Sequence, residues 1–117
     1  MSSLKEQIRI NAALQYVMPM NRHINCIRLN PGNSPEHEFR KVRIAWELLK
    51  MNQSFVMEAK LIRGGIIDLL WLNKLVGIEV MYSETPEELK EKIKKYPSEI
   101  EIRSVDSKKP FDNKEFL

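Results

Sequence analysis

Two carboxylates interrupt apolar, β-branched stretches of this 117-residue chain. Asp68 lies within residues 64–72, and Glu79 lies within residues 76–81. An ionised carboxylate is costly to bury unless another group compensates its charge. A divalent cation is one such group, and Mg²⁺ prefers hard oxygen ligands of this kind. The two stretches are therefore compatible with a metal site.

A third carboxylate, Glu38, stands near the start of a predicted helix that runs from Pro35 to about residue 51. Ser34 suits the N-cap and Pro35 the first helical position. Glu38 either turns toward the other two acids or acts as a first-turn acid that interacts favourably with the helix dipole. Its neighbour His37 lies about 100° away around the helix, which predicts a surface position. The apolar face around Glu38 is predicted to be Phe39, Val42, Ala45, Trp46 and Leu49.

Three strands are predicted to follow as an antiparallel meander, because only short turns separate them. Alternation along the third strand places Glu79 on the same face as Gly77 and Met81. Glu58, in the first strand, faces either the site or solvent, since a shift of one residue in the hairpin register would reverse its direction. The three predicted strands cover residues 54–61, 66–72 and 76–82.

A second helix is predicted over residues 85–96, with Thr85 and Glu88 forming a capping box. Lys92 borders its buried stripe, which is expected to be Leu89, Ile93 and Tyr96. A half-buried fourth strand is predicted over residues 100–105, where apolar and polar residues alternate. The helix between the third and fourth strands permits a crossover connection and therefore a mixed sheet. An earlier helix, capped by Ser3, is predicted to run to about residue 17.

The order of these elements, with Glu38, Asp68 in the segment GIID and Glu79 in the segment GIEVM, resembles the PD-(D/E)xK nuclease superfamily. That superfamily includes restriction-endonuclease-like and archaeal-resolvase-like proteins. The resemblance implies an α/β fold with a restriction-endonuclease-like α-β-β-β-α-β core and a mixed four-stranded sheet. The division that it implies is an N-terminal helical extension (1–33), the nuclease-like core (34–105) and a polar C-terminal tail (106–117).

The resemblance also implies roles for the residues of the site. Asp68, Glu79 and the main-chain carbonyl of Val80 would bind Mg²⁺ or Mn²⁺. Glu38 would hold a metal-bound water or a second metal. The implied function is that of a metal-dependent DNA endonuclease.

Met81 stands where the superfamily carries its lysine, which positions the attacking water. Three alternatives follow: a lysine from elsewhere in the chain replaces it, the activity is weak, or the fold is retained as an inactive module that binds nucleic acid or a protein. Lys92 is the first candidate for a relocated lysine and Lys60 the second. Lys92 could equally be a solvated residue whose stem covers the core.

The net charge of +3 and the pI of about 9.0 are compatible with a polyanionic partner. The charge does not establish such a partner, but the resemblance implies DNA, including branched or single-stranded DNA, bound mainly through its phosphates. A homodimer is expected because cleavage of two strands commonly uses two copies of one site. The same basic residues could equally form a solvated charged surface. The candidate phosphate contacts are Arg40, Lys41, Arg43, Lys60 and Arg63, with Lys74 beside them.

Other features of the chain exclude some classes of protein. The chain contains no run of about 18 apolar residues, so no transmembrane helix is indicated. The N-terminus lacks the pattern of a signal peptide, so a cytoplasmic protein is expected. The single cysteine, Cys26, excludes an internal disulfide and a cysteine-based zinc site, and is expected to be a partly buried apolar residue.

Overall fold

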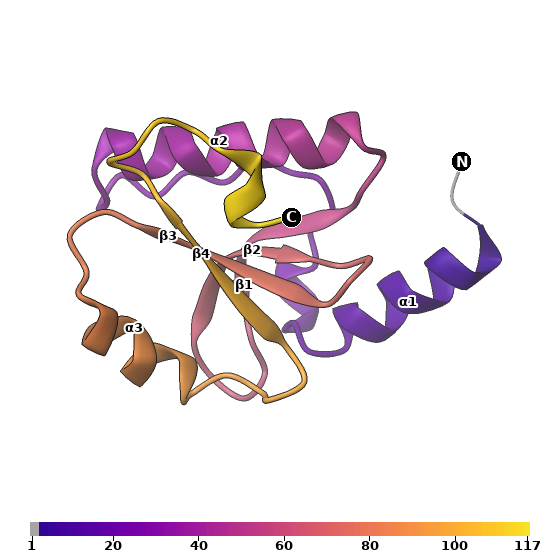
Figure 1. Cartoon of the computed structure of the whole chain (residues 1–117). Helices are drawn as coiled ribbons and strands as arrows, with labels where there is room; N and C mark the ends of the chain where they lie inside the picture. Colours follow the sequence, from indigo (N-terminus) through magenta and orange to yellow (C-terminus); the bar gives the residue numbers. More distant parts are fainter. Residues whose placement is uncertain (1–2) are drawn as a thin grey trace.

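The computed structural model describes residues 3–117, which form an α/β fold around a mixed four-stranded sheet (Figure 1). The strand order is β1-β2-β3-β4. The first three strands are antiparallel, and β4 runs parallel to β3. The sequence-based prediction of a meander and a mixed sheet is confirmed. The strands are β1 (Phe55–Lys60), β2 (Ile66–Trp71), β3 (Val76–Met81) and β4 (Glu101–Asp106).

Three α-helices occur within residues 3–117, and each begins at a predicted cap. The hydroxyl groups of Ser3, Ser34 and Thr85 accept hydrogen bonds from main-chain N–H groups three residues later. Such caps satisfy donors that have no partner inside the helix. The helices are α1 (Leu4–Leu14), α2 (Pro35–Lys50) and α3 (Pro86–Ile93), with short 3-10 turns η1 (Pro19–Asn21) and η2 (Asn113–Glu115).

The helices lie on opposite sides of the sheet (Figure 1). On the α2 side, Ile44 and Leu48 pack with Met57, Leu69 and other buried residues of the strands. On the other side, a second cluster contains residues of α1, the loop after α3 and the opposite faces of the strands. Among its members are Ile10, Ala13, Val17, Leu70 and Ile100.

The orientation of α2 differs from the prediction. Phe39 is 68% exposed and Trp46 is 59% exposed, whereas Ile44 and Leu48 are fully buried. The prediction was wrong because it placed the most hydrophobic arc of the helix toward the core. The buried arc instead includes charged residues that compensate one another. Its members are His37, Glu38, Lys41, Ile44, Ala45 and Leu48.

The backbone of β1 is irregular at Glu58, which has a φ of +53°. Met57 packs on the α2 side of the sheet, and Ala59 packs on the other side with Leu61. The left-handed conformation at Glu58 therefore turns the side chains that follow it to the face opposite the one that regular strand alternation would give them. Such a conformation is strained for a residue with a Cβ, and strain of this kind clusters at functional sites.

The terminal segments belong to the same packed structure. Val17 pairs with Leu61 in an isolated bridge, and Ile24 pairs with Val56. Phe116 is fully buried, so the prediction of a polar tail does not hold at that residue. The C-terminal segment thus closes part of the core beside α2.

Candidate functional site

The backbone pairing between β2 and β3 ends just before Asp68 and Glu79. Leu69 pairs with Ile78, and the same register would place Asp68 opposite Glu79. Instead, Oδ2 of Asp68 accepts a hydrogen bond from the main-chain N–H of Val80 at 2.8 Å. Asp68 is 7% exposed and Glu79 is 1% exposed. The structure therefore brings these two predicted site residues together as a buried pair of acids.

Glu79 is the less acidic member of this pair. Burial, followed by the negative charge of Asp68, raises the pKa of Glu79 to about 8, although Tyr96 and Lys92 act in the opposite direction. The Tyr96 hydroxyl lies 2.6 Å from Oε1 of Glu79 and 3.0 Å from the carbonyl oxygen of Ile66. Two buried carboxylates cannot both ionise cheaply without a nearby cation.

A lysine reaches the same carboxylate from α3. The Nζ atom of Lys92 lies 3.7 Å from Oε2 of Glu79 and 3.5 Å from Oε2 of Glu84. The Lys92 side chain is 41% exposed, so its ammonium group is also open to solvent. The sequence made Lys92 the first candidate for a relocated lysine because it lies at the border of the predicted helix stripe. Its contact with Glu79 depends on where α3 lies over the sheet.

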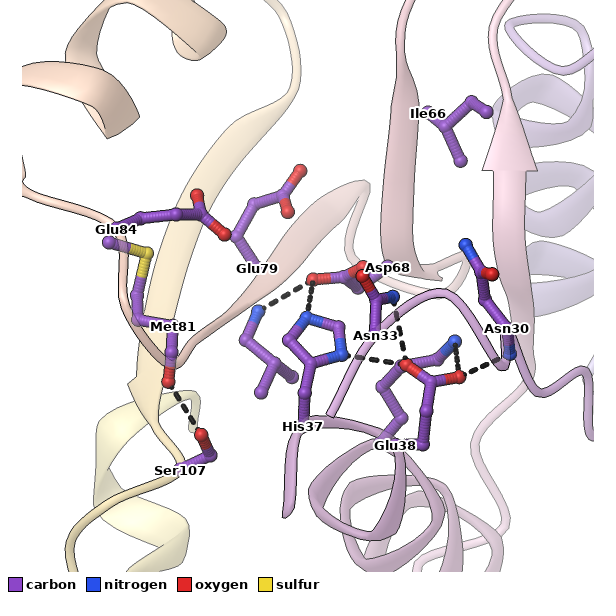
Figure 2. A network of polar contacts seen from close by, with 12 residues as sticks. Asn30, Asn33, His37, Glu38, Ile66, Asp68, Glu79, Met81, Glu84 and Ser107 are labelled. Atoms are coloured by element: carbon purple, nitrogen blue, oxygen red, sulfur yellow. Dashed lines mark hydrogen bonds and ion pairs between the residues drawn. The ribbon is translucent and has the colours of Figure 1, made fainter. Parts of the chain in front are cut away.

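His37 connects the other two acids of the predicted set (Figure 2). Its Nδ1 lies 2.7 Å from Oε2 of Glu38, and its Nε2 lies 3.4 Å from Oδ2 of Asp68. Burial opposes protonation of His37, but the hydrogen bonds and charges of Asp68 and Glu38 raise its pKa to about 9. The surface position predicted for His37 was wrong, because it is only 6% exposed. The imidazolium thus separates Glu38 from Asp68.

The carboxylate of Glu38 is fully occupied by donors from its surroundings. Lys41 donates at 2.8 Å and the side-chain amide of Asn33 at 3.1 Å, while the main-chain N–H of Asn30 also donates to it. Burial raises the pKa of Glu38, but these donors and His37 more than offset that effect and lower it to about 2. Glu38 therefore fixes the loop before α2 and contacts Asp68 only through His37.

Lys41 does not lie on the surface that the sequence analysis assigned to it. It is fully buried, and its ammonium group lies 2.8 Å from Glu38 and 3.2 Å from Glu58. It also donates to the main-chain carbonyl of Arg28 at 3.1 Å. Glu58 accordingly points toward the site side of the sheet, which settles the alternative left open by the sequence. A direct contact between Lys41 and a phosphate group is incompatible with this position.

The other basic candidates differ in their availability. Arg40 donates to the carbonyl groups of Asp106 and Lys109, and Arg43 pairs with Glu47 at 3.1 Å. Both guanidinium groups also lie over the Phe111 ring, so they hold the C-terminal segment against α2. In contrast, Lys60 and Arg63 are exposed. A hollow of about 280 Å³ beside β1 and β2 is lined by Lys60 together with Arg28, Glu58 and Ile66.

Within residues 3–117, no group of three or more His, Cys, Asp or Glu side chains is arranged to hold a metal ion. The donor set that remains is the pair of Asp68 and Glu79. Magnesium commonly binds through one or two protein carboxylates and keeps several waters, so a pair of this kind fits its chemistry. Zinc sites use three or four protein ligands, which this pair does not provide.

Two further expectations concern the rest of the molecule. Cys26 is exposed, which differs from the partly buried position expected for it. Over the described residues, no helix combines the length and apolar character that a membrane crossing requires. No family model, curated protein or solved structure matches the chain.

Proposed function

We propose that this chain is a metal-dependent DNA endonuclease of the PD-(D/E)xK type, with Asp68 and Glu79 as ligands for Mg²⁺ or Mn²⁺. The observation that carries the proposal is the buried pair of carboxylates on β2 and β3 with the Lys92 ammonium group 3.7 Å from Glu79. The element order α2-β1-β2-β3-α3-β4 and the mixed sheet also support the proposal, because the resemblance implies an α-β-β-β-α-β order with a mixed sheet.

The electrostatics of the pair support a cation at this position. The negative charge of Asp68 raises the pKa of Glu79, so the two acids repel each other when both are ionised. A divalent cation would remove that repulsion and favour ionisation of both groups. Val80 already contributes its N–H group to Asp68, and its carbonyl oxygen is proposed as a third ligand by analogy with the superfamily.

Several side chains would position the reacting groups. A bound cation would neutralise phosphate oxygens and lower the pKa of the attacking water. Lys92 would orient that water and offset the charge that develops at the phosphate, in place of the lysine that Met81 replaces. Tyr96 holds Glu79 by a hydrogen bond, and His37 holds Asp68 from the side of α2. Glu38 acts through His37 as a positioning residue.

The proposed substrate is DNA, bound through its phosphates. Lys60 and Arg63 are exposed near the ends of the β1–β2 hairpin, and Lys60 lines a hollow that Glu58 and Ile66 also border. Contacts of this kind fix the backbone but carry little sequence information. Recognition of branched or single-stranded DNA would then depend on the shape of the substrate.

Calorimetric titration of Mg²⁺ and Mn²⁺ into the full chain tests the metal site. The wild-type chain is expected to bind the cation, and Asp68→Asn is expected to abolish or strongly weaken that binding. Asp112→Asn is the matched control, because Asp112 is exposed and an asparagine can still cap η2. An absence of binding, or binding that Asp68→Asn leaves unchanged, would contradict the proposed site.

A second candidate function is an inactive module of the same fold that binds nucleic acid or a protein partner. Two observations favour it: Met81 replaces the lysine of the motif, and the donors of His37 and Val80 already occupy Asp68. A module that binds nucleic acid should bind DNA without cleaving it in the presence of Mg²⁺ or Mn²⁺, and a module that binds a protein should neither bind nor cleave DNA. Electrophoretic mobility shifts and cleavage assays on the same oligonucleotides distinguish the two functions.

A further inference from the structure

The outward side of α2 carries an apolar stripe that no part of residues 3–117 covers. Phe39 and Trp46 are 68% and 59% exposed, and Leu49 is 40% exposed. Val42, between them on the helix, is only partly buried. Figure 1 shows α2 along one outer side of the molecule. Helix α2 packs on the sheet through Ile44 and Leu48, so the exposed stripe lies on another side of the helix. A contiguous exposed apolar stripe that contains two large aromatic residues is typical of an interaction surface.

The spacing of the stripe is that of a helix-pairing seam. Phe39, Val42, Trp46 and Leu49 are separated by three, four and three residues. Apolar residues with this alternation occupy the a and d positions of a heptad and pack against a second helix. Helix α2 contains 16 residues, enough for two turns of such a seam on each side of its centre.

The charges beside the seam are self-complementary in one orientation. If two copies of α2 pair in antiparallel fashion about a two-fold axis near Ile44, Phe39 of one copy meets Leu49 of the other, and Val42 meets Trp46. The same arrangement places Glu36, at the start of the helix, near Lys50 of the second copy. Two-fold symmetry generates this pair twice. Arg43, which lies near the axis, is paired with Glu47 at 3.1 Å, and Lys50 lies 3.4 Å from the same carboxylate, so Lys50 would be shared between Glu47 and Glu36 of the second copy.

We propose that two copies of this chain form an antiparallel dimer through the α2 stripe of Phe39, Val42, Trp46 and Leu49. A second copy accounts for the aliphatic Val42 and Leu49, which cannot stack on bases as aromatic residues do. It also accounts for flanking charges of both signs, whereas a nucleic-acid surface carries mainly positive charge. The inference does not depend on the proposed nuclease activity, since none of these four side chains belongs to the acidic pair or its partners.

Sedimentation velocity of the full chain over a range of concentrations provides the first test. The wild-type chain is expected to sediment as a dimer, and Trp46→Lys is expected to sediment as a monomer with an unchanged circular dichroism spectrum. Dimerisation is also expected to shift the tryptophan fluorescence to the blue as the protein concentration rises. Trp46 is exposed and Trp71 is 2% exposed, so this shift should come from Trp46. Phe39→Lys is the second variant, in case Trp46→Lys alters folding.

Charge reversal tests the orientation of the pair. Glu36→Lys and Lys50→Glu are each expected to weaken dimerisation roughly tenfold, because each change creates two repulsive pairs across the interface. The double variant, Glu36→Lys with Lys50→Glu, is expected to restore it. Lys94→Glu, at the exposed C-cap position of α3, is the control and should leave dimerisation unchanged.

Three outcomes would overturn the proposal. The first is a wild-type chain that remains monomeric at the highest accessible concentration. If single-stranded DNA also quenched the fluorescence of Trp46 in that monomer, the stripe would be a nucleic-acid surface and the proposal would fail in the same way. The second is a dimer that persists in Trp46→Lys and Phe39→Lys, which would place the interface elsewhere. The third is a double charge variant that fails to recover the association lost in each single variant.

Discussion

The ammonium group of Lys92 lies 3.7 Å from the carboxylate of Glu79, although the two residues come from a helix and a strand separated by a loop. Met81, which stands where the proposed motif would carry its lysine, is only two residues from Glu79 in sequence. The contact therefore brings the positive charge of Lys92 to the acidic pair from a different element of the fold. Its partial exposure leaves the Lys92 side chain accessible to a substrate as well.

Replacement of this lysine should affect catalysis more than folding. Lys92→Ala is expected to lower the rate of metal-dependent DNA cleavage by about 100-fold or more, because a residue that orients or activates water typically contributes at least that factor. Lys94→Ala is the control, since Lys94 is exposed and pairs with the exposed Glu91. Full activity in Lys92→Ala would show that Lys92 is a structural residue.

The bridge formed by His37 should be important for stability. His37→Ala is expected to lower the free energy of unfolding by about 2–4 kcal/mol, because it leaves two buried carboxylates without their shared donor. Urea denaturation at neutral pH measures this change. His23→Ala, at an exposed histidine, should leave the midpoint unchanged. Equal effects of the two variants would contradict the bridging role.

The raised pKa of Glu79 predicts the pH dependence of stability. The pKa of this group is about 8 in the folded protein and near 4.5 otherwise, so the folded state binds more protons between these values. The stabilisation linked to this group is therefore complete below about pH 4.5 and is lost as the pH rises through about 8. Glu79→Gln should consequently raise the melting temperature of the metal-free protein above about pH 8 and have little effect near pH 5. A variant that is less stable than the wild type at high pH would contradict this prediction.

Two adjacent glycines allow a matched test of the Tyr96 contact. Gly64 and Gly65 both have positive φ values, of 101° and 89°. A Cβ added at Gly65 would lie 2.7 Å from the Tyr96 ring, whereas one added at Gly64 meets nothing within 4 Å. Gly65→Ala should therefore lose more stability than Gly64→Ala, by about 1–3 kcal/mol, since overpacking adds to the shared backbone strain. Thermal melts of the two variants measure the difference, and equal losses would show that Tyr96 moves without cost.

The sequence predicted the helices, the caps and the strands well, because these depend on local signals. Ser34 with Pro35 and Thr85 with Pro86 mark helix starts through side-chain capping and a fixed φ. The short turns between strands likewise required an antiparallel meander. The acidic pair of Asp68 and Glu79 was also found from sequence, since acids within apolar strands are unusual.

The relations between elements could not be predicted in the same way. The arc that α2 buries is decided by compensation among His37, Glu38 and Lys41, which hydrophobicity alone does not report. The available sequence signal for this network was His37 next to Glu38 in the first turn of the predicted helix. The left-handed conformation at Glu58 changes the face of the strand, and no residue type announces it there because glycine is absent.

Cleavage of DNA tests the central claim most directly. End-labelled duplex, single-stranded and branched oligonucleotides would be incubated with the full chain in the presence of Mg²⁺, Mn²⁺ or EDTA. The account predicts cleavage of at least one substrate with either cation, no cleavage in EDTA, and loss of cleavage in Asp68→Asn and Glu79→Gln but not in Asp112→Asn. Absence of cleavage of every substrate, or cleavage that persists in Asp68→Asn, would contradict it.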